Sequence, residues 1–230
     1  MRDLITSLSD RAEFILVLLI GFGYATFASL ALFLSSGGLQ VPDQGIPVSD
    51  VSAYSTIIYE LLMLWVISRI LKLRDWSIKD FNVQISLRLT LAGLLLGAIY
   101  YTVYLALFSL SSSFFDIIKE TAATFQINND NLNVIAAIAL SAVNAFFEEI
   151  LVVGYVVGAL KEKRGITVAI NVSVLIRFSY HLYQGPLAVI GIIPLGLLFA
   201  YVYARWGRLW PLIFAHGLID AMVLTGYPGP

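Results

Sequence analysis

Long apolar runs, separated by polar or basic residues, dominate the chain and predict membrane-spanning helices. A helix needs about 20 apolar residues to cross the hydrocarbon core of a bilayer. The runs that approach or reach this length are 12–34, 53–73, 87–110, 132–160, 166–183, 187–204 and 209–225. We therefore expect an all-α fold, a polytopic transmembrane helix bundle of about seven spans.

The polar connections between these runs carry weaker local signals. Residues 35–50 are rich in Gly, Pro and Ser and predict a loop. Residues 73–85 predict a short interfacial amphipathic helix, because Trp76 and Phe81 occur there beside basic residues that suit the headgroup layer. The run 128–131 predicts a loop that caps the fourth span.

The composition places the whole chain in a bilayer. Hydrophobic residues make up 59% and charged residues 13%, whereas soluble domains have about 45–50% and about 25%. The net charge of -1 gives no basic excess, so we expect no nucleic-acid partner. The absence of cysteine excludes disulfides and thiolate metal sites. The first run is longer than a signal-peptide core and ends without a clear cleavage site, so a cleavable signal peptide is not expected.

Basic residues gather in alternate connections and predict the orientation. They precede span one, follow spans two and four, and join spans six and seven: Arg2, Arg11, Arg69, Lys72, Arg74, Lys79, Arg88, Lys161, Lys163, Arg164, Arg205 and Arg208. The other connections hold Lys119 among acidic residues. The positive-inside rule therefore predicts a cytoplasmic N-terminus and an external C-terminus.

Four ionisable side chains stand out within the apolar runs. The two histidines of the chain, His181 and His216, lie in spans five and seven, and the adjacent Glu148 and Glu149 lie in span four. Ionisable groups in hydrocarbon are costly and mark functional sites by default. Two imidazoles and an acid pair on separate helices are the groups needed to activate a water molecule.

Helical spacing gives these groups neighbours. Adjacent helix positions point about 100° apart, so only one of the two glutamates can face a given cavity. Arg177 is four residues before His181 and should pair with Glu148 or Glu149, or else with Asp220, because an unpaired arginine at that depth is costly. His216 and Asp220 are also four apart. The carboxylate then either orients the imidazole or faces a substrate together with it.

For two further side chains, a structural interpretation has at least as much weight as a functional one. Tyr180 is expected to pack or to act as an interfacial phenol. Glu60, in span two, is equally compatible with a simple hydrogen bond between helices and with a functional role.

The order of Glu148-Glu149, His181 and His216…Asp220 resembles the CPBP family of CAAX prenyl protease and bacteriocin-processing-like (Abi) intramembrane proteases. The first motif of that family is a Glu-Glu pair followed by three residues and an arginine. The second places a phenylalanine four residues before a histidine, and the third is a histidine with Asn or Asp four residues on. The resemblance covers about residues 132–225. It implies that residues 1–131 are N-terminal transmembrane helices and loops and 132–230 are CPBP-like catalytic helices, within one integral membrane domain.

The chain departs from the family pattern at two positions. Val153 stands where the first motif has arginine, and Arg177 stands where the second has phenylalanine. Our hypothesis is that the cation has moved between helices, so that Arg177 holds the acid pair that an arginine at position 153 would have held.

The resemblance implies an intramembrane endopeptidase, of a glutamate type, in a bacterial cytoplasmic membrane. Glu148 would be the general base and His181 would polarise the attacking water. His216 and Asp220 would stabilise the oxyanion, or Asp220 would orient His216, while Glu149 supports the site through Arg177. The substrate would be a membrane-embedded or membrane-tethered peptide.

Three alternatives stay open. No cofactor is favoured, but a divalent metal such as zinc would be held by the two imidazoles and Glu148. A non-catalytic immunity or scaffold protein would bind a peptide in the same polar cavity. A proton-coupled transporter would also need buried Glu and His, although the inverted repeats or broken helices typical of such proteins are not seen in the sequence.

Overall fold

The structure, a computed structural model, describes residues 5–37, 46–125 and 127–226. Five of its helical stretches are long and apolar enough to cross a membrane: α2 (Asp10–Ser35), α3 (Asp50–Lys72), α4 (Leu87–Phe114), Val134–Arg164 and Pro186–Trp206. Two shorter apolar helices are α8 (Ile166–Ser179) and α11 (Trp210–Leu224). The predicted all-α transmembrane bundle is confirmed, whereas the number of about seven spans stays a prediction. Arg2, which entered the charge pattern, lies outside the described residues.

The fourth apolar stretch is a continuous helix with a wider segment in its middle. It consists of α6 (Val134–Glu148), the π-helix η2 (Glu149–Tyr155) and α7 (Val156–Arg164). Asn133 caps its start, where the side chain accepts a hydrogen bond from the backbone N–H of Ala136. The prediction of one regular helix is therefore wrong at Glu149, where the π-helix begins. π-helical turns occur frequently at functional sites.

The fifth and sixth apolar stretches are shorter and more interrupted than predicted. The fifth helix ends at Ser179, so residues 180–183 lie outside it. They lead through the 3-10 turn η3 (Leu182–Gln184) to Gly185, whose φ of +58° favours glycine. The sixth stretch then begins as α9 (Pro186–Ile190), which is followed by α10 (Ile192–Trp206).

A small parallel sheet joins two segments that the sequence predicted as loops. β1 (Ile46–Ser49) pairs with β2 (Ile127–Asn131), and Ile46 lies opposite Ile127. The loop predictions for 35–50 and 128–131 are corrected over these strands. Residues 38–45 of the first loop lie outside the described residues. A further surface helix, α5 (Asp116–Thr124), precedes β2.

The segment after α3 packs its aromatic side chains against the rest of the protein. The 3-10 turn η1 (Ile78–Phe81) is its helical part, and Phe81 is buried. The Trp76 ring lies 5.1 Å from that of Tyr155 and 5.7 Å from that of Phe81. A side chain at Gly154 would meet Phe81 at 2.9 Å, so glycine permits this close approach. The predicted interfacial amphipathic helix is thus reduced to one turn, with Trp76 and Phe81 packed inward.

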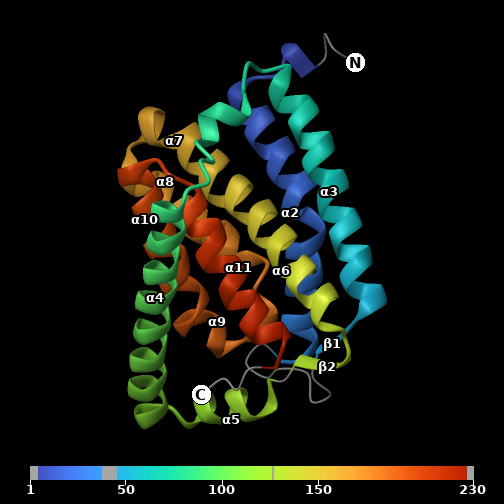
Figure 1. Cartoon of the computed structure of the whole chain (residues 1–230), viewed down its shortest axis with the longest axis vertical. Helices are drawn as coiled ribbons and strands as arrows, with labels where there is room; N and C mark the ends of the chain where they lie inside the picture. The colour runs from blue at the N-terminus through green and yellow to red at the C-terminus, as the bar shows by residue number, and fades with distance from the viewer. Residues whose placement is uncertain (1–4, 38–45, 126, 227–230) are drawn as a thin grey trace.

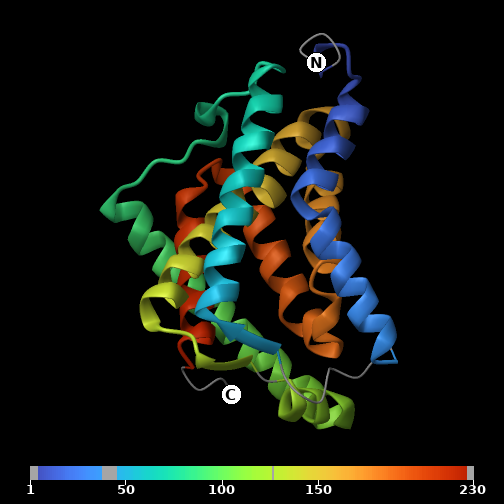
Figure 2. The same ribbon diagram turned by 90° about the vertical axis from the view of Figure 1, so that its right-hand side faces the viewer.

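The bundle places α11 between α4 and α6, with α10 against α8 (Figure 1). The helices α2 and α3 stand beside α6 and separate toward the end of the molecule that carries β1 and β2 (Figure 2). One hydrophobic cluster includes side chains from both halves of the chain, among them Phe22, Ile67, Leu151 and Phe199. Large apolar side chains such as Phe27 remain exposed on the outside, as expected of a lipid-facing surface.

A charged cluster lies at the end of the bundle opposite β1 and β2. The Arg74 guanidinium donates from Nε to Glu13 at 2.7 Å and from Nη2 to Asp10 at 3.1 Å. Asp10 also binds Lys163 at 2.6 Å, and Tyr155 donates to Glu13 at 3.0 Å. The hydrogen bond with Glu13 raises the pKa of Arg74 above its ordinary value. Basic residues from separate connections therefore meet at one end.

Candidate active site

Arg177, on α8, bridges the two adjacent glutamates. Its Nη1 atom lies 3.1 Å from Glu148 Oε2, and its Nη2 atom lies 2.6 Å from Glu149 Oε1. Arg177 and Glu149 are fully buried, and Glu148 is 6% exposed. The predicted pairing of Arg177 with the acid pair is therefore present. It connects α8 to the junction of α6 and the π-helix.

Glu148 is held at one oxygen and open at the other. Its Oε2 atom accepts from Arg177 and also from the Tyr180 hydroxyl at 2.7 Å. Its Oε1 atom accepts no hydrogen bond from the described residues. The expected packing of Tyr180 is present, because its ring stacks on that of Phe22 at 4.8 Å, and its hydroxyl in addition fixes the position of the Glu148 carboxylate.

His216 continues the same network on α11. Its Nδ1 atom lies 2.7 Å from Glu149 Oε1, and its Nε2 atom lies 3.5 Å from Asp220 Oδ1. Asp220 in turn accepts a hydrogen bond from Asn144 at 2.8 Å. Since 3.5 Å exceeds a good N–H···O distance, the Nδ1 contact with Glu149 is the one that orients the imidazole. Asp220, the neighbour predicted from spacing, makes the weaker contact.

His181 lies in the turn after α8, not on the helix as the sequence predicted. Its Nδ1 atom is 2.9 Å from the backbone oxygen of Arg177. A carbonyl can only accept, so Nδ1 carries the proton and Nε2 has the free lone pair. The ring centroid lies 4.6 Å from that of Tyr180, whose hydroxyl binds Glu148. His181 thus borders the network without a side-chain hydrogen bond to it.

A pocket of about 340 Å³ reaches this network from the side of α2 and α3. Glu148, Asn144 and Tyr180 line its inner wall, and Glu60 lines it from α3. Glu149 does not line it and is fully buried. Of the two glutamates, one therefore faces a cavity while the other braces its neighbours, as helix geometry predicts for adjacent positions.

The comparisons with known proteins concern the part of the chain that carries this network. Residues 130–222 match the family model described as "Type II CAAX prenyl endopeptidase Rce1-like". We call this matched part of the chain the Rce1-like domain. This agrees with the resemblance to the CPBP family. No curated protein and no solved structure matches the chain.

The Rce1-like domain contains every ionisable residue of the network, from Glu148 to Asp220. The family is one of membrane proteases that act on membrane-associated peptides. Together, the match over residues 130–222 and the long apolar helices support an integral membrane protein that is similar to CPBP-type proteases over that part of the chain.

The donor atoms of the Rce1-like domain do not form a metal-ligand set. Among the described residues, no three His, Cys, Asp or Glu side chains are grouped so as to hold a metal ion. Glu148 Oε2 is occupied by Arg177, and both nitrogens of His216 face carboxylates. The arrangement of Glu148, His181 and His216 considered for zinc is therefore not assembled in this geometry.

The sequence pattern did not indicate Asn144, a member of the network, or Ser173, which supports the π-helix beside it. Asn144 lies four residues before Glu148, and that spacing, which places both on one helix face, is a signal for it. Ser173 donates to the backbone oxygen of Val152, inside the π-helix, at 2.7 Å. No pattern pointed to Ser173, because its role depends on the π-helix.

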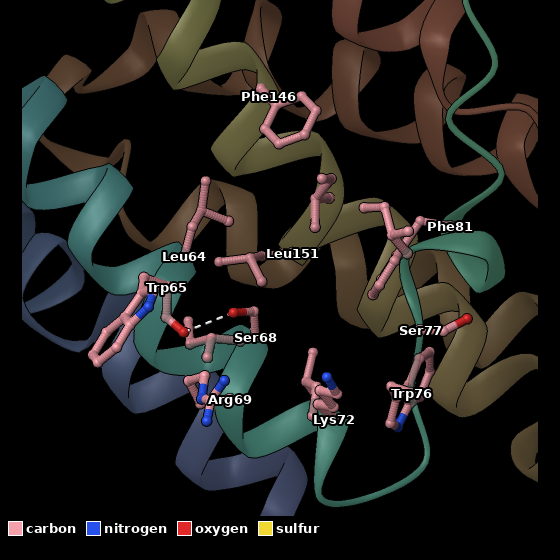
Figure 3. A pocket seen from close by; sticks show the side chains of 14 residues that line it. Leu64, Trp65, Ser68, Arg69, Lys72, Trp76, Ser77, Phe81, Phe146 and Leu151 are labelled. Carbon is pink, nitrogen blue, oxygen red and sulfur yellow. Dashed lines mark hydrogen bonds between the residues drawn. The ribbon is translucent and has the colours of Figure 1, made fainter.

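A larger groove lies apart from the network (Figure 3). Its volume is about 550 Å³, and its apolar wall includes Leu64, Phe81 and Leu151 between α3, η1 and the fourth helix. Arg69 and Lys72 stand on its α3 side. No residue of the ionisable network lines this groove, so the smaller pocket is the one that serves the candidate site.

Proposed function

We propose that the chain is an intramembrane endopeptidase in which Glu148 is the general base. It would take a proton from a water molecule as the water oxygen attacks a peptide carbonyl of the substrate, and would give that proton to the leaving amine nitrogen as the peptide C–N bond breaks. The observation that carries the proposal is the position of Glu148, whose Oε2 is fixed by two donors while the carboxylate faces a pocket. A candidate base must reach its proton directly or through one water.

The other residues then have distinct roles. His181 offers its free Nε2 to the attacking water, and His216 donates from Nε2 to the oxyanion that forms on the carbonyl. Because its contact with Asp220 is long, the Nε2–H of His216 is only weakly engaged and can also donate to a substrate oxygen. Glu149 orients His216 through Nδ1, and Arg177 balances the charge of both glutamates. Asp220 contacts the other ring nitrogen of His216, Nε2, and helps to position the ring.

The substrate and orientation belong to the same proposal. A pocket bordered by α2 and α3 suits a peptide that is embedded in or tethered to the membrane. The meeting of Arg74 and Lys163 at the end where α2 begins supports a cytoplasmic N-terminus under the positive-inside rule. We place the protein in a bacterial cytoplasmic membrane.

A reconstituted cleavage assay tests the proposal. Purified protein in liposomes is incubated with a library of lipid-anchored peptides, and the products are identified by mass spectrometry. Glu148→Gln, which keeps the shape of the side chain, should lower cleavage by about 100-fold or more. Glu162→Gln, on the exposed end of α7, is the matched control and should behave as wild type. Wild-type rates in Glu148→Gln, or no cleavage by the wild-type protein, would overturn the proposal.

A further inference from the structure

Glu60 is a buried acid that the proposed catalytic residues do not use. It is the eleventh residue of α3, about 15 Å along the helix from Asp50 at a rise of about 1.5 Å per residue, so it lies near the middle of this candidate span. It is only 5% exposed, and its Oε2 atom has no hydrogen-bond partner among the described residues. A buried polar group is normally satisfied, and an exception calls for an explanation.

The side chain of Glu60 lines the same pocket as Glu148. The pocket is at the small end of the range for ligand sites, so a ligand that touches Glu148 also passes Glu60. The α3 wall is polar for more than a turn, with Ser55, Thr56 and Tyr59 preceding Glu60. This wall fits a short stretch of peptide better than it fits an acyl chain.

The charges around Glu60 are unbalanced. The charged groups that act on it are the carboxylates of Glu148 and Asp220 and the imidazole of His216. His216 already lies between Glu149 and Asp220, and Arg177 is bound to Glu148 and Glu149. Glu60 therefore has no cation of its own among the described residues, and a ligand that brings one would complete the pocket.

The outer side of the pocket favours the same kind of ligand. The rings of Tyr24 and Tyr59 lie 6.4 Å apart, and Tyr24 is 72% exposed. Tyrosine faces attract ammonium and guanidinium groups. A cation that enters between α2 and α3 would meet aromatic faces first and the buried carboxylate afterwards.

We propose that Glu60 is a specificity-determining residue that binds a lysine or arginine side chain of the substrate close to the scissile bond. The inference rests on the proposed function, because it treats the bound peptide as a substrate. Binding of the peptide at Glu60 does not itself require catalysis. A lone ammonium in hydrocarbon is costly, and a charge-assisted hydrogen bond to Glu60 offsets that cost only for a peptide with a correctly placed basic residue.

The test compares lysine with norleucine, which has a similar aliphatic chain without the charge. A set of lipid-anchored peptides carries one lysine at successive positions, each with its norleucine counterpart. Binding is measured by fluorescence anisotropy with full-length Glu148→Gln protein in nanodiscs, so that no peptide is cleaved. At one position we expect the lysine peptide to bind about tenfold tighter or more. When Glu60→Gln is combined with Glu148→Gln in one protein, the ratio of the affinities for the lysine and norleucine peptides should come close to one.

Two further variants separate recognition from folding. Glu60→Asp keeps the charge and should retain part of the lysine preference, whereas Glu120→Gln, an exposed substitution on α5, should retain all of it. Equal binding of lysine and norleucine peptides at every position overturns the inference, as does a preference that survives Glu60→Gln. A lysine preference in binding without cleavage by the wild-type protein would refute the proposed protease function alone. Cleavage without a preference would refute the role of Glu60 alone.

Discussion

Arg177 Nη2 lies 2.6 Å from Glu149 Oε1, and neither side chain is exposed. The same guanidinium reaches Glu148, so one cation on α8 fastens both acids of the fourth helix. Breaking a buried pair by removing one partner is strongly destabilising, because the other charge stays buried without compensation. Here two carboxylates would lose their cation at once.

Arg177→Phe should therefore lower the stability of the protein by about 3 to 5 kcal/mol. The free energy of unfolding in detergent, followed by circular dichroism against denaturant, measures this loss. Arg205→Phe, which removes an arginine near the end of α10 whose guanidinium lies over the Tyr201 ring, is the control and should cost far less. A loss below about 1 kcal/mol in Arg177→Phe, the size of an exposed ion pair, would contradict the structural role of the bridge.

The second substitution Val153→Arg tests whether the cation has moved between helices. Val153 is fully buried in the π-helix, four residues after Glu149. If Arg177 replaces an arginine at position 153, the double variant Arg177→Phe with Val153→Arg should regain part of the lost stability and of the cleavage activity. A double variant that is no better than Arg177→Phe in both measurements disproves the replacement.

Tyr180→Phe removes the second donor to Glu148 Oε2 while the ring remains in place. We expect the cleavage rate to fall by about tenfold to a hundredfold, because a hydrogen bond to a charged group is worth about 1.5 to 3 kcal/mol. Tyr100→Phe is the matched control, since that buried hydroxyl makes only a 3.4 Å contact with the backbone of Gly191. An equal decrease in kcat for both variants would show that the hydroxyl of Tyr180 has no special connection with Glu148.

The parts of the site that follow from the cost of burying charge were predictable from sequence. A buried arginine needs a carboxylate, and this requirement alone led from Arg177 to Glu148 and Glu149. The contact between Glu149 and His216 was not predictable, because it depends on how α11 lies against the fourth helix. Spacing along one helix indicated Asp220 as the partner of His216, and the closer partner comes from another helix.

The π-helix and the small sheet show where sequence patterns carry no information. Residues 150–153 are all apolar and all buried. No alternation of polar and apolar positions is present that would distinguish an α-helix from a π-helix. β1 and β2 are about 80 residues apart, and their Pro-, Ser- and Asn-containing sequences indicate loops. Only the packing of the whole bundle brings them side by side.

The charged cluster at the start of α2 contains three ion pairs, and those of Arg74 should respond to substitution differently from that of Lys163. Arg74 contacts Glu13, which is buried, whereas Lys163 contacts the exposed part of Asp10. Arg74→Met should lower the melting temperature clearly, and Lys163→Met should change it little. Molar salt should remove most of the remaining Lys163 effect, because it screens exposed charges. Equal shifts in melting temperature for the two variants would refute this difference.

Ser173 and Ser141 form a natural comparison for the π-helix. Both are 1% exposed, and both donate to a backbone carbonyl, but Ser141 bonds to Ala137 in its own helix while Ser173 reaches across to Val152. Ser141→Ala removes a bond within one helix and should cost less than about 1 kcal/mol. Ser173→Ala deprives a π-helical carbonyl of its partner on another helix and should cost about 1 to 3 kcal/mol. Because Val152 follows Glu149 by three residues, Ser173→Ala should also lower kcat, whereas Ser141→Ala should leave it unchanged. If the two alanine variants prove equally stable and equally active, the contact between α8 and the π-helix does not position Glu149.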